Sequence, residues 1–118
     1  MKLKEIEKIV IKTRKQFRNN EINEILLIDL YQKYNPHVGD IHVYVNKSKE
    51  IFPYLNCGLT TVYLQHILQR GKIIQGKYNS NDHTFLLLPR NIVIDITADQ
   101  FGGPECYVGR LREPWTVD

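Results

Sequence analysis

Residues 56–70, NCGLTTVYLQHILQR, form the clearest helical pattern in the chain. Their apolar side chains cover much of a helix circumference, which indicates a central and mostly buried helix. Asn56 is a good N-cap residue, and Gly71 stands where a left-handed C-terminal cap belongs. The pattern therefore places Cys57 in the first turn of a buried helix.

Three strands are predicted after this helix, over residues 72–78, 83–88 and 91–97. With a hairpin loop over 89–91, Phe85 faces Asp95, and His83 lies diagonally from Asp95 on one face, about 7–8 Å away before the side chains reach out. A two-residue loop would put them on opposite faces. Asp95 is flanked by apolar residues, where an unpaired carboxylate is costly. We therefore expect His83 to be its partner.

The rest of the chain completes an α+β pattern. Helices are expected over residues 3–17 and 21–34, a short strand over 41–45 and a loop over 46–54. Regular structure should end at residues 101–104, leaving a tail with short strand character. We expect one domain over 1–118, with an N-terminal helical part over 1–34 and a core over 50–104, in which the Cys57 helix packs on a small antiparallel sheet of three to five strands.

Composition narrows the class of protein. The chain has 118 residues, of which 42% are hydrophobic and 25% charged, as in an ordinary globular domain. No apolar run approaches the roughly 20 residues of a membrane-spanning helix. The N-terminus lacks the apolar core of a secretory signal, and two cysteines make no disulfide framework. A cytoplasmic setting, or export without a cleavable N-terminal signal, is expected.

The positive charge gathers at the N-terminus. Residues 1–20 hold seven of the 16 Lys and Arg residues and two of the 13 acidic residues. The helix predicted there is either an ordinary solvated face or a docking surface for an acidic partner. A pI near 8.9 is too mild to argue for nucleic-acid binding by itself, so nucleic acid is an unlikely partner.

The order of Cys57, His83 and Asp95 on these elements points to nucleophilic catalysis. A thiol in a first helical turn meets unpaired N–H groups and the positive end of the helix dipole, both of which favour thiolate. An imidazole on a neighbouring strand can take its proton, and a carboxylate can orient that imidazole. Taken alone, Cys57 fits a small core residue better than a nucleophile. His66 falls on the opposite side of the helix, and His37 and His42 are expected to be exposed.

The motifs Asn56-Cys57, Asp82-His83-Thr84-Phe85 and Ile94-Asp95-Ile96-Thr97 resemble the papain-like superfamily, in particular its compact bacterial branches. These include transglutaminase-like proteins, papain-fold toxins and glutamine deamidases. The resemblance covers roughly residues 50–104 and implies that Cys57 is the nucleophile, His83 the general base and acid, and Asp95 the orienting residue. It also implies a protein or peptide substrate that presents an amide, no cofactor, and a role as a bacterial effector or toxin.

Two features depart from papain-type proteases. The chain lacks their glutamine a few residues before the cysteine, so Asn56, Gln100 or backbone amides such as that of Gly58 would bind the oxyanion, with Asp99 a second candidate for lining the site. It is also short for a protease. Both features favour an amidase, a glutamine deamidase or an acyltransferase such as a transglutaminase.

Other classes of function fit the sequence less well. The side chains of Cys57, His83, Asp95, Asp99 and Cys106 include metal-ligand types, but no zinc-binding spacing is present, and no metal is expected. Gly71 and Gly76 do not fit a nucleotide-binding loop. The main alternative is a non-catalytic binding module that uses the basic N-terminal helix as its contact surface.

Overall fold

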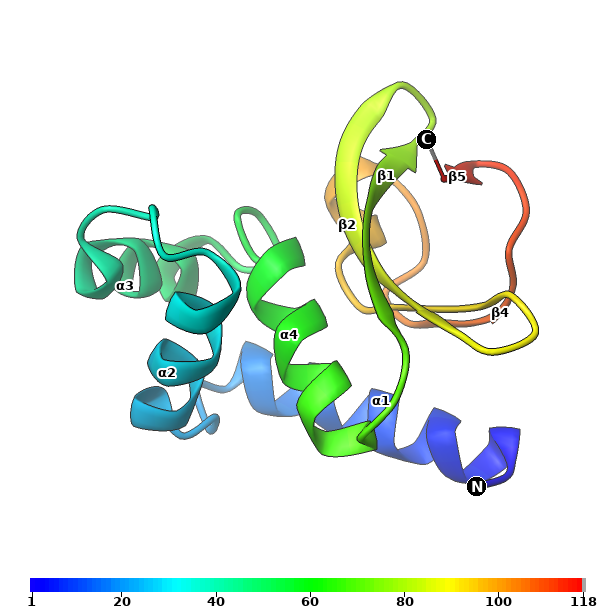
Figure 1. Ribbon diagram of the computed structural model, residues 1–118, viewed down its shortest axis with the longest axis horizontal. Helices are drawn as coiled ribbons and strands as arrows, with labels where there is room; N and C mark the ends of the chain where they lie inside the picture. The colour runs from blue at the N-terminus through cyan, green and yellow to red at the C-terminus, as the bar shows by residue number, and fades with distance from the viewer. Residues whose placement is uncertain (118) are drawn as a thin grey trace.

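The structure is a computed structural model and describes residues 1–117. It is an α+β fold in which four helices precede a five-stranded antiparallel curled sheet, a half-barrel (Figure 1). The helices are α1 (Leu3–Arg18), α2 (Glu24–Tyr34), α3 (Ile41–Ile51) and α4 (Cys57–Leu68). The remaining elements are β1 (Lys72–Tyr78), β2 (Asn81–Leu88), β3 (Ile92–Asp95), the 3-10 helix η1 (Ala98–Phe101), β4 (Tyr107–Arg110) and β5 (Trp115–Thr116). None of the helices in this range is long and apolar enough to cross a membrane.

The predicted helices at 3–17 and 21–34 are present as α1 and α2. Helix α1 buries one face, which carries Ile6, Val10 and Phe17 at helical spacing. Helix α2 begins three residues later than predicted because the side chain of Asn23 accepts a hydrogen bond from the Leu26 N–H and so caps the helix.

The strand predicted over 41–45 and the loop over 46–54 were wrong, because residues 41–51 form helix α3. The alternating β-branched residues of this segment imitate a strand. The Asp40 side chain accepts hydrogen bonds from the N–H groups of His42 and Val43 and caps a helix instead. Ile41, Val45 and Ser48 then fall on one buried face at helical spacing.

The hairpin register was predicted correctly. Leu86 pairs with Ile94 and Leu88 with Ile92, as a three-residue loop requires. Regular structure does not end at residues 101–104, however, since β4 adds to β3 and β5 adds to β1, giving the order β4-β3-β2-β1-β5. The sheet curls so far that Tyr107 of one edge strand stacks on Trp115 of the other, with ring centroids 4.0 Å apart.

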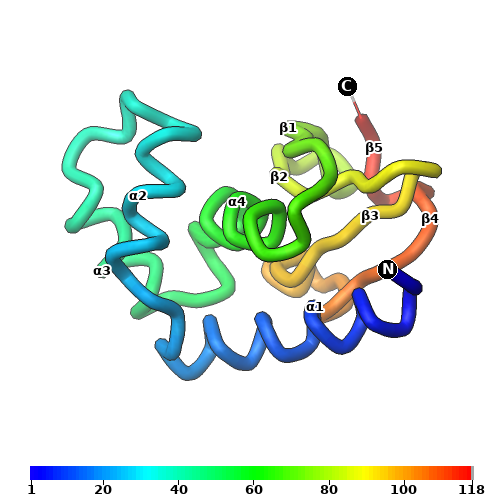
Figure 2. The backbone as a smooth tube through the Cα atoms, turned by 60° about the horizontal axis from the view of Figure 1, so that its bottom comes forward, coloured from blue at the N-terminus to red at the C-terminus, as the bar shows by residue number. Residues whose placement is uncertain are grey.

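Helix α4 lies between the other helices and the sheet, and α1 crosses beneath both (Figure 2). One hydrophobic core joins the four helices to the face of the sheet that carries Leu86 and Ile94. A second core fills the hollow of the curled sheet, around Phe85 and Trp115. Successive residues of a strand face opposite sides, so β2 and β3 contribute to both cores. Cys57 begins the helix that contacts β2, and His83 and Asp95 belong to these strands.

Candidate functional site

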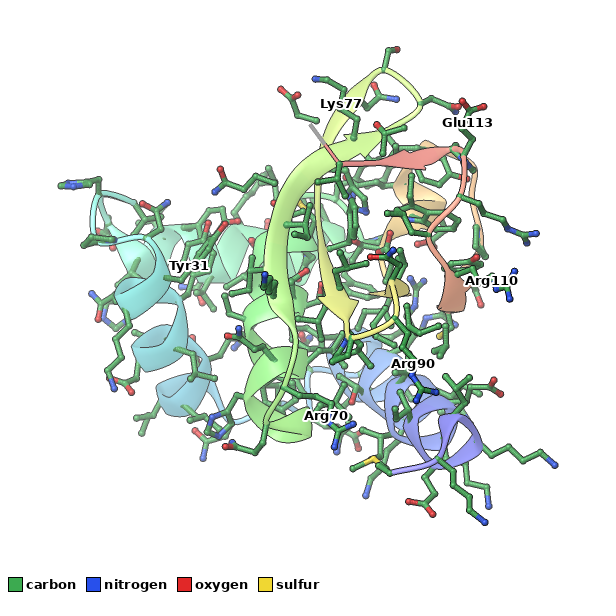
Figure 3. All side chains as sticks on the ribbon, turned by 45° about the vertical axis from the view of Figure 1, so that its right-hand side comes forward. Tyr31, Arg70, Lys77, Arg90, Arg110 and Glu113 are labelled. Carbon is green, nitrogen blue, oxygen red and sulfur yellow. The ribbon has the colours of Figure 1, made fainter. Side chains whose placement is uncertain are left out.

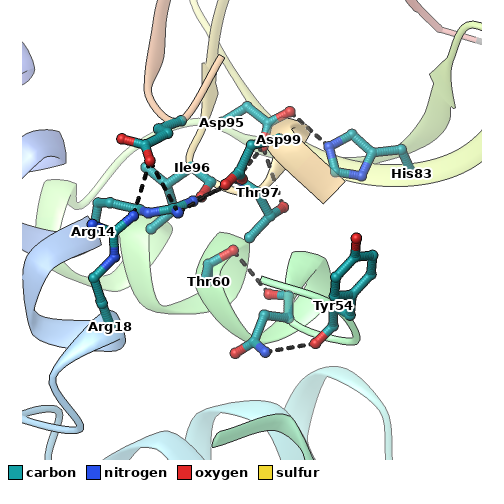
Figure 4. Close-up of polar contacts among 11 residues, drawn as sticks. Arg14, Arg18, Tyr54, Thr60, His83, Asp95, Ile96, Thr97 and Asp99 are labelled. Carbon is teal, nitrogen blue, oxygen red and sulfur yellow. Dashed lines mark hydrogen bonds and ion pairs between the residues drawn. The ribbon is translucent and has the colours of Figure 1, made fainter. Parts of the chain in front are cut away.

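The structure brings His83 and Asp95 into direct contact. The Nε2 of His83 donates to the Oδ2 of Asp95 at 2.6 Å, and both side chains are almost completely buried (Figure 4). The diagonal placement expected from the hairpin register accounts for this contact. Because a carboxylate only accepts hydrogen bonds, the contact fixes the ring proton on Nε2 and leaves Nδ1 as the nitrogen that can exchange a proton.

Asp95 is held by three further donors. The Trp115 indole N–H donates to Oδ2 at 2.8 Å, and Thr97 donates to Oδ1 through its backbone N–H at 2.9 Å and its hydroxyl at 3.3 Å. This buried carboxylate is therefore fully hydrogen-bonded and fixed in orientation. Trp115 was missed in the sequence, because it lies 20 residues after Asp95 on a two-residue strand that no periodicity reveals.

Aromatic rings surround the imidazole of His83. Phe101 meets it edge-on at 5.3 Å and Tyr78 at 6.3 Å, and Phe85 lies at 6.2 Å. Burial lowers the pKa of His83, but Asp95 and the neighbouring Cys57 outweigh it and raise the pKa to about 9. The Nδ1 atom is buried and has no hydrogen-bond partner among residues 1–117. A buried polar atom without a partner is uncommon and marks this nitrogen as available.

Cys57 occupies the first position of α4 and stands beside His83. Burial raises the pKa of its thiol, but the His83 side chain and the polar groups of Thr84 lower it by more, so the net pKa lies below the ordinary value. The Asn56 side chain does not cap α4, so the N–H groups of the first turn are not used by that residue.

The thiol lies where two open pockets meet. A pocket of about 430 Å³ is lined by Cys57, His83, Thr84, Gln75, Gly76 and Asp82. A second, of about 360 Å³, includes Tyr31, Tyr34 and Tyr44. The two pockets share Cys57, Gln75 and Thr84.

Gly76 stands directly opposite His83 in the β1–β2 register. A side chain there would collide with the Thr116 carbonyl and press on Phe85. The absence of a Cβ lets the main chain of β5 approach β1 beside Phe85.

The other site residues predicted from the sequence have different surroundings. Both side-chain N–H groups of Asn56 are occupied by the carbonyl oxygens of Ser48 and Tyr54, at 2.8 Å each. Gly58 is buried against Tyr31, whose ring atom Cε1 lies 3.0 Å from where a Cβ would be. Gln100 lies on η1 and lines neither of the two pockets, and its buried Nε2 has no partner among the described residues. We therefore look to backbone N–H groups of α4, rather than these side chains, for oxyanion binding.

Asp99 and part of the basic N-terminal helix serve a separate contact. Arg14, on α1, is 5% exposed; it binds both carboxylate oxygens of Asp99 at 2.8 Å and donates to the Ile96 carbonyl (Figure 4). Arg18 pairs with Glu105 at the surface. Arg14 and Arg18, which were expected to face solvent or a partner, therefore join α1 to the segment after β3. The lysines of α1 remain exposed.

The second cysteine has opposite properties. Cys106 packs partly buried against the helical core, and burial raises the pKa of its thiol. Within residues 1–117, no three His, Cys, Asp or Glu side chains gather as they would to hold a metal ion.

Comparisons with protein-family models, curated proteins and solved structures found no match to this chain. The papain-like resemblance thus remains a prediction from short motifs, and the functional argument depends on the geometry of this site.

Proposed function

We propose that the protein is a cysteine-dependent amide hydrolase or acyl transferase with a papain-like core, in which Cys57 is the nucleophile, His83 the general base and acid, and Asp95 the orienting group. One observation carries the proposal. The buried imidazole binds Asp95 through Nε2, its buried Nδ1 has no hydrogen-bond partner among residues 1–117, and the neighbouring Cys57 thiol has a lowered pKa. A purely structural histidine in a core normally has both ring nitrogens satisfied.

The chemistry follows from these roles. The Cys57 thiolate attacks the carbonyl carbon of an amide, and His83, carrying the thiol proton on Nδ1, gives it to the leaving amine. N–H groups in the first turn of α4 stabilise the oxyanion. The resulting thioester is cleaved by water, which gives an acid, or by an amine, which gives a new amide; in either case the acceptor's proton passes to His83 and the thiol is restored. Glutamine deamidation and transglutamination are the two outcomes for a glutamine side chain.

The test measures the alkylation rate of both cysteines with iodoacetamide, by peptide mass spectrometry across a pH series. We expect Cys57 to react as a thiolate well below the ordinary thiol pKa of about 8.5, and Cys106 to lag behind it. His83→Gln should remove this advantage and leave Cys106 unchanged. A Cys57 profile that matches Cys106, or one that His83→Gln does not move, would overturn the proposal.

A substrate assay then separates the two acceptors. Unfolded casein is incubated with the protein, and ammonia release is compared with covalent incorporation of dansylcadaverine. Cys57→Ser is the matched inactive variant, since it replaces only the sulfur. Loss of both products in this variant is expected, because a serine hydroxyl beside the same imidazole is a far weaker nucleophile.

The alternative of a non-catalytic binding module has one observation in its favour, the exposed apolar residues Leu3 and Ile11 among the lysines of α1. It predicts an inert Cys57, so the alkylation experiment discriminates between the two.

A further inference from the structure

Three pockets adjoin strand β1. The two at Cys57 include Gln75 and its β2 partner Thr84, and a third, of about 550 Å³, continues past Tyr34 to Ile73, His66 and Arg70 at the start of the strand. Tyr34 lines both the third pocket and the tyrosine-lined pocket at Cys57. In Figure 3, β1 runs from near Arg70 to Lys77. We name the three pockets together the β1 groove.

The main chain of β1 is only partly paired along its outer edge, the edge to which β5 adds. The N–H of Asn79 donates to the Pro114 carbonyl, on the side of β5. In an antiparallel strand, alternate residues direct their N–H and C=O groups to the same side, so those of Gln75 and Ile73 point the same way. Strand β5 pairs only with Lys77 and Tyr78. No strand within residues 1–117 therefore covers the outer edge at Gln75 and Ile73, which is the kind of edge to which an extended peptide adds.

The groove has a charge preference at its far end. The pocket beside Ile73 is lined by Lys33, His66 and Arg70 and by no acidic residue. Lys33 already pairs with Asp29 on its own helix, at 3.0 Å. Arg70 is exposed and forms no ion pair within the described chain, so its charge is available to a ligand.

We propose that the β1 groove binds an extended, acidic polypeptide segment, which pairs through its main chain with Ile73 and Gln75 and places an acidic side chain near Arg70. The segment thereby delivers its amide to Cys57. This inference rests on the proposed function, since it assigns the substrate of the same site. The exposed hydrogen bond from Gln75 to the Tyr34 hydroxyl, 2.7 Å long, spans the groove and opens when the segment binds.

The test uses short peptides that carry a chloroacetyl group, whose reaction with Cys57 forms a carbon–sulfur bond and releases chloride. One peptide is glutamate-rich, a second is its lysine-rich counterpart, and a third is the glutamate-rich peptide with N-methylated backbone amides. Each is made in two forms, with the electrophile at either end, because the segment can run in either direction. The labelling rate of Cys57 is divided by its rate with free chloroacetamide.

This ratio separates the two proposals. An unactivated thiol would slow chloroacetamide and the peptides together and would contradict the proposed function, whereas the ratio reports only binding along the groove. For at least one form, we expect the glutamate-rich peptide to label about tenfold faster than the lysine-rich one, less so at high salt. N-methylation should cost a similar factor, because it removes main-chain donors.

Matched variants locate the effect. Arg70→Ser should bring the acidic and basic peptides closer together, whereas Arg110→Ser, an equally exposed arginine on β4 away from the groove (Figure 3), should not. The peptide rates of each variant are divided by that variant's own chloroacetamide rate. Equal labelling by acidic and basic peptides in both forms would overturn the acidic ligand, and equal labelling by the N-methylated peptide would overturn pairing along β1.

Discussion

Two carboxylates, four residues apart in the chain, are used in opposite ways: Asp95 is buried and Asp99 is partly buried. Asp99 holds the guanidinium of Arg14 with both oxygens, and this pair joins α1 to η1. Asp95 holds the imidazole of His83, and the second nitrogen of that ring has no partner within residues 1–117. A guanidinium group does not serve as a proton donor or acceptor in catalysis, whereas an imidazole does. The Arg14–Asp99 pair joins two structural elements, whereas the His83–Asp95 pair positions a group that can still react.

Breaking the Arg14–Asp99 ion pair should have the largest effect, and this effect should be a loss of stability. Arg14→Met leaves Asp99 without its partner, and the free energy of unfolding should drop by about 3 kcal/mol. Urea denaturation measures this loss. Arg18→Met, on the same helix, removes only the exposed pair with Glu105 and should change stability by less than about 1 kcal/mol. The alkylation rate of Cys57 should stay the same in folded Arg14→Met protein; a large fall would mean that the two clusters are not separate.

The Arg14–Asp99 and His83–Asp95 pairs should also differ in how their contributions to stability depend on pH. His83 has a folded pKa of about 9, above its usual 6.5, so the stability from its charged form is present below about pH 6.5 and lost as the pH rises towards 9. Cys57, with a lowered pKa, acts with the opposite sign, so the measurement belongs in a Cys57→Ser background.

In that background we expect the free energy of unfolding to fall by about 2 kcal/mol between pH 6.5 and 9. Adding His83→Gln should flatten this dependence. Adding Arg14→Met should lower the whole curve and keep its slope, since it leaves His83 and Asp95 in contact. A slope that survives His83→Gln would show that another group titrates.

Asp95→Asn sharpens the comparison at the reactive cluster. It keeps the shape of the side chain but removes the charge that raises the pKa of His83, so the imidazole should be less able to stabilise a thiolate. We expect the alkylation rate of Cys57 near pH 6 to fall about tenfold, as for a rise of one unit in the thiol pKa. Asp99→Asn is the matched control and should lower stability without slowing alkylation. If Asp95→Asn and Asp99→Asn slowed the alkylation of Cys57 equally, the two carboxylates would not have different roles.

The sequence revealed the His83–Asp95 contact because it depends on short-range rules. A three-residue hairpin loop and alternating strands suffice to place these residues diagonally. The apolar helical pattern suffices to place Cys57 at a helix start, although the Asn56 side chain does not cap that helix as predicted. Helix α3 escaped prediction because its β-branched residues imitate a strand, although Asp40 and the spacing of Ile41, Val45 and Ser48 carried the correct signal. The contacts of Arg14 and Trp115 depend on distant segments meeting in space, which no local pattern encodes.

The smallest expected effect concerns Trp115, which both joins structural elements and contacts the His83–Asp95 pair. Its indole N–H donates to the oxygen of Asp95 that also binds His83, and its ring stacks on Tyr107 where the two sheet edges meet. Trp115→Phe removes the hydrogen bond and keeps an aromatic ring, so stability should fall by about 1 kcal/mol.

The alkylation rate of Cys57 should change only a few-fold in Trp115→Phe, because Thr97 and His83 still hold the carboxylate. Thr97→Val, which loses only a 3.3 Å hydrogen bond from the hydroxyl, is the milder control for stability. If Trp115→Phe slowed alkylation as much as Asp95→Asn, the orientation of the carboxylate rather than its charge would govern the thiol. The indole would then belong with His83 in the reactive cluster rather than with the contacts that close the sheet.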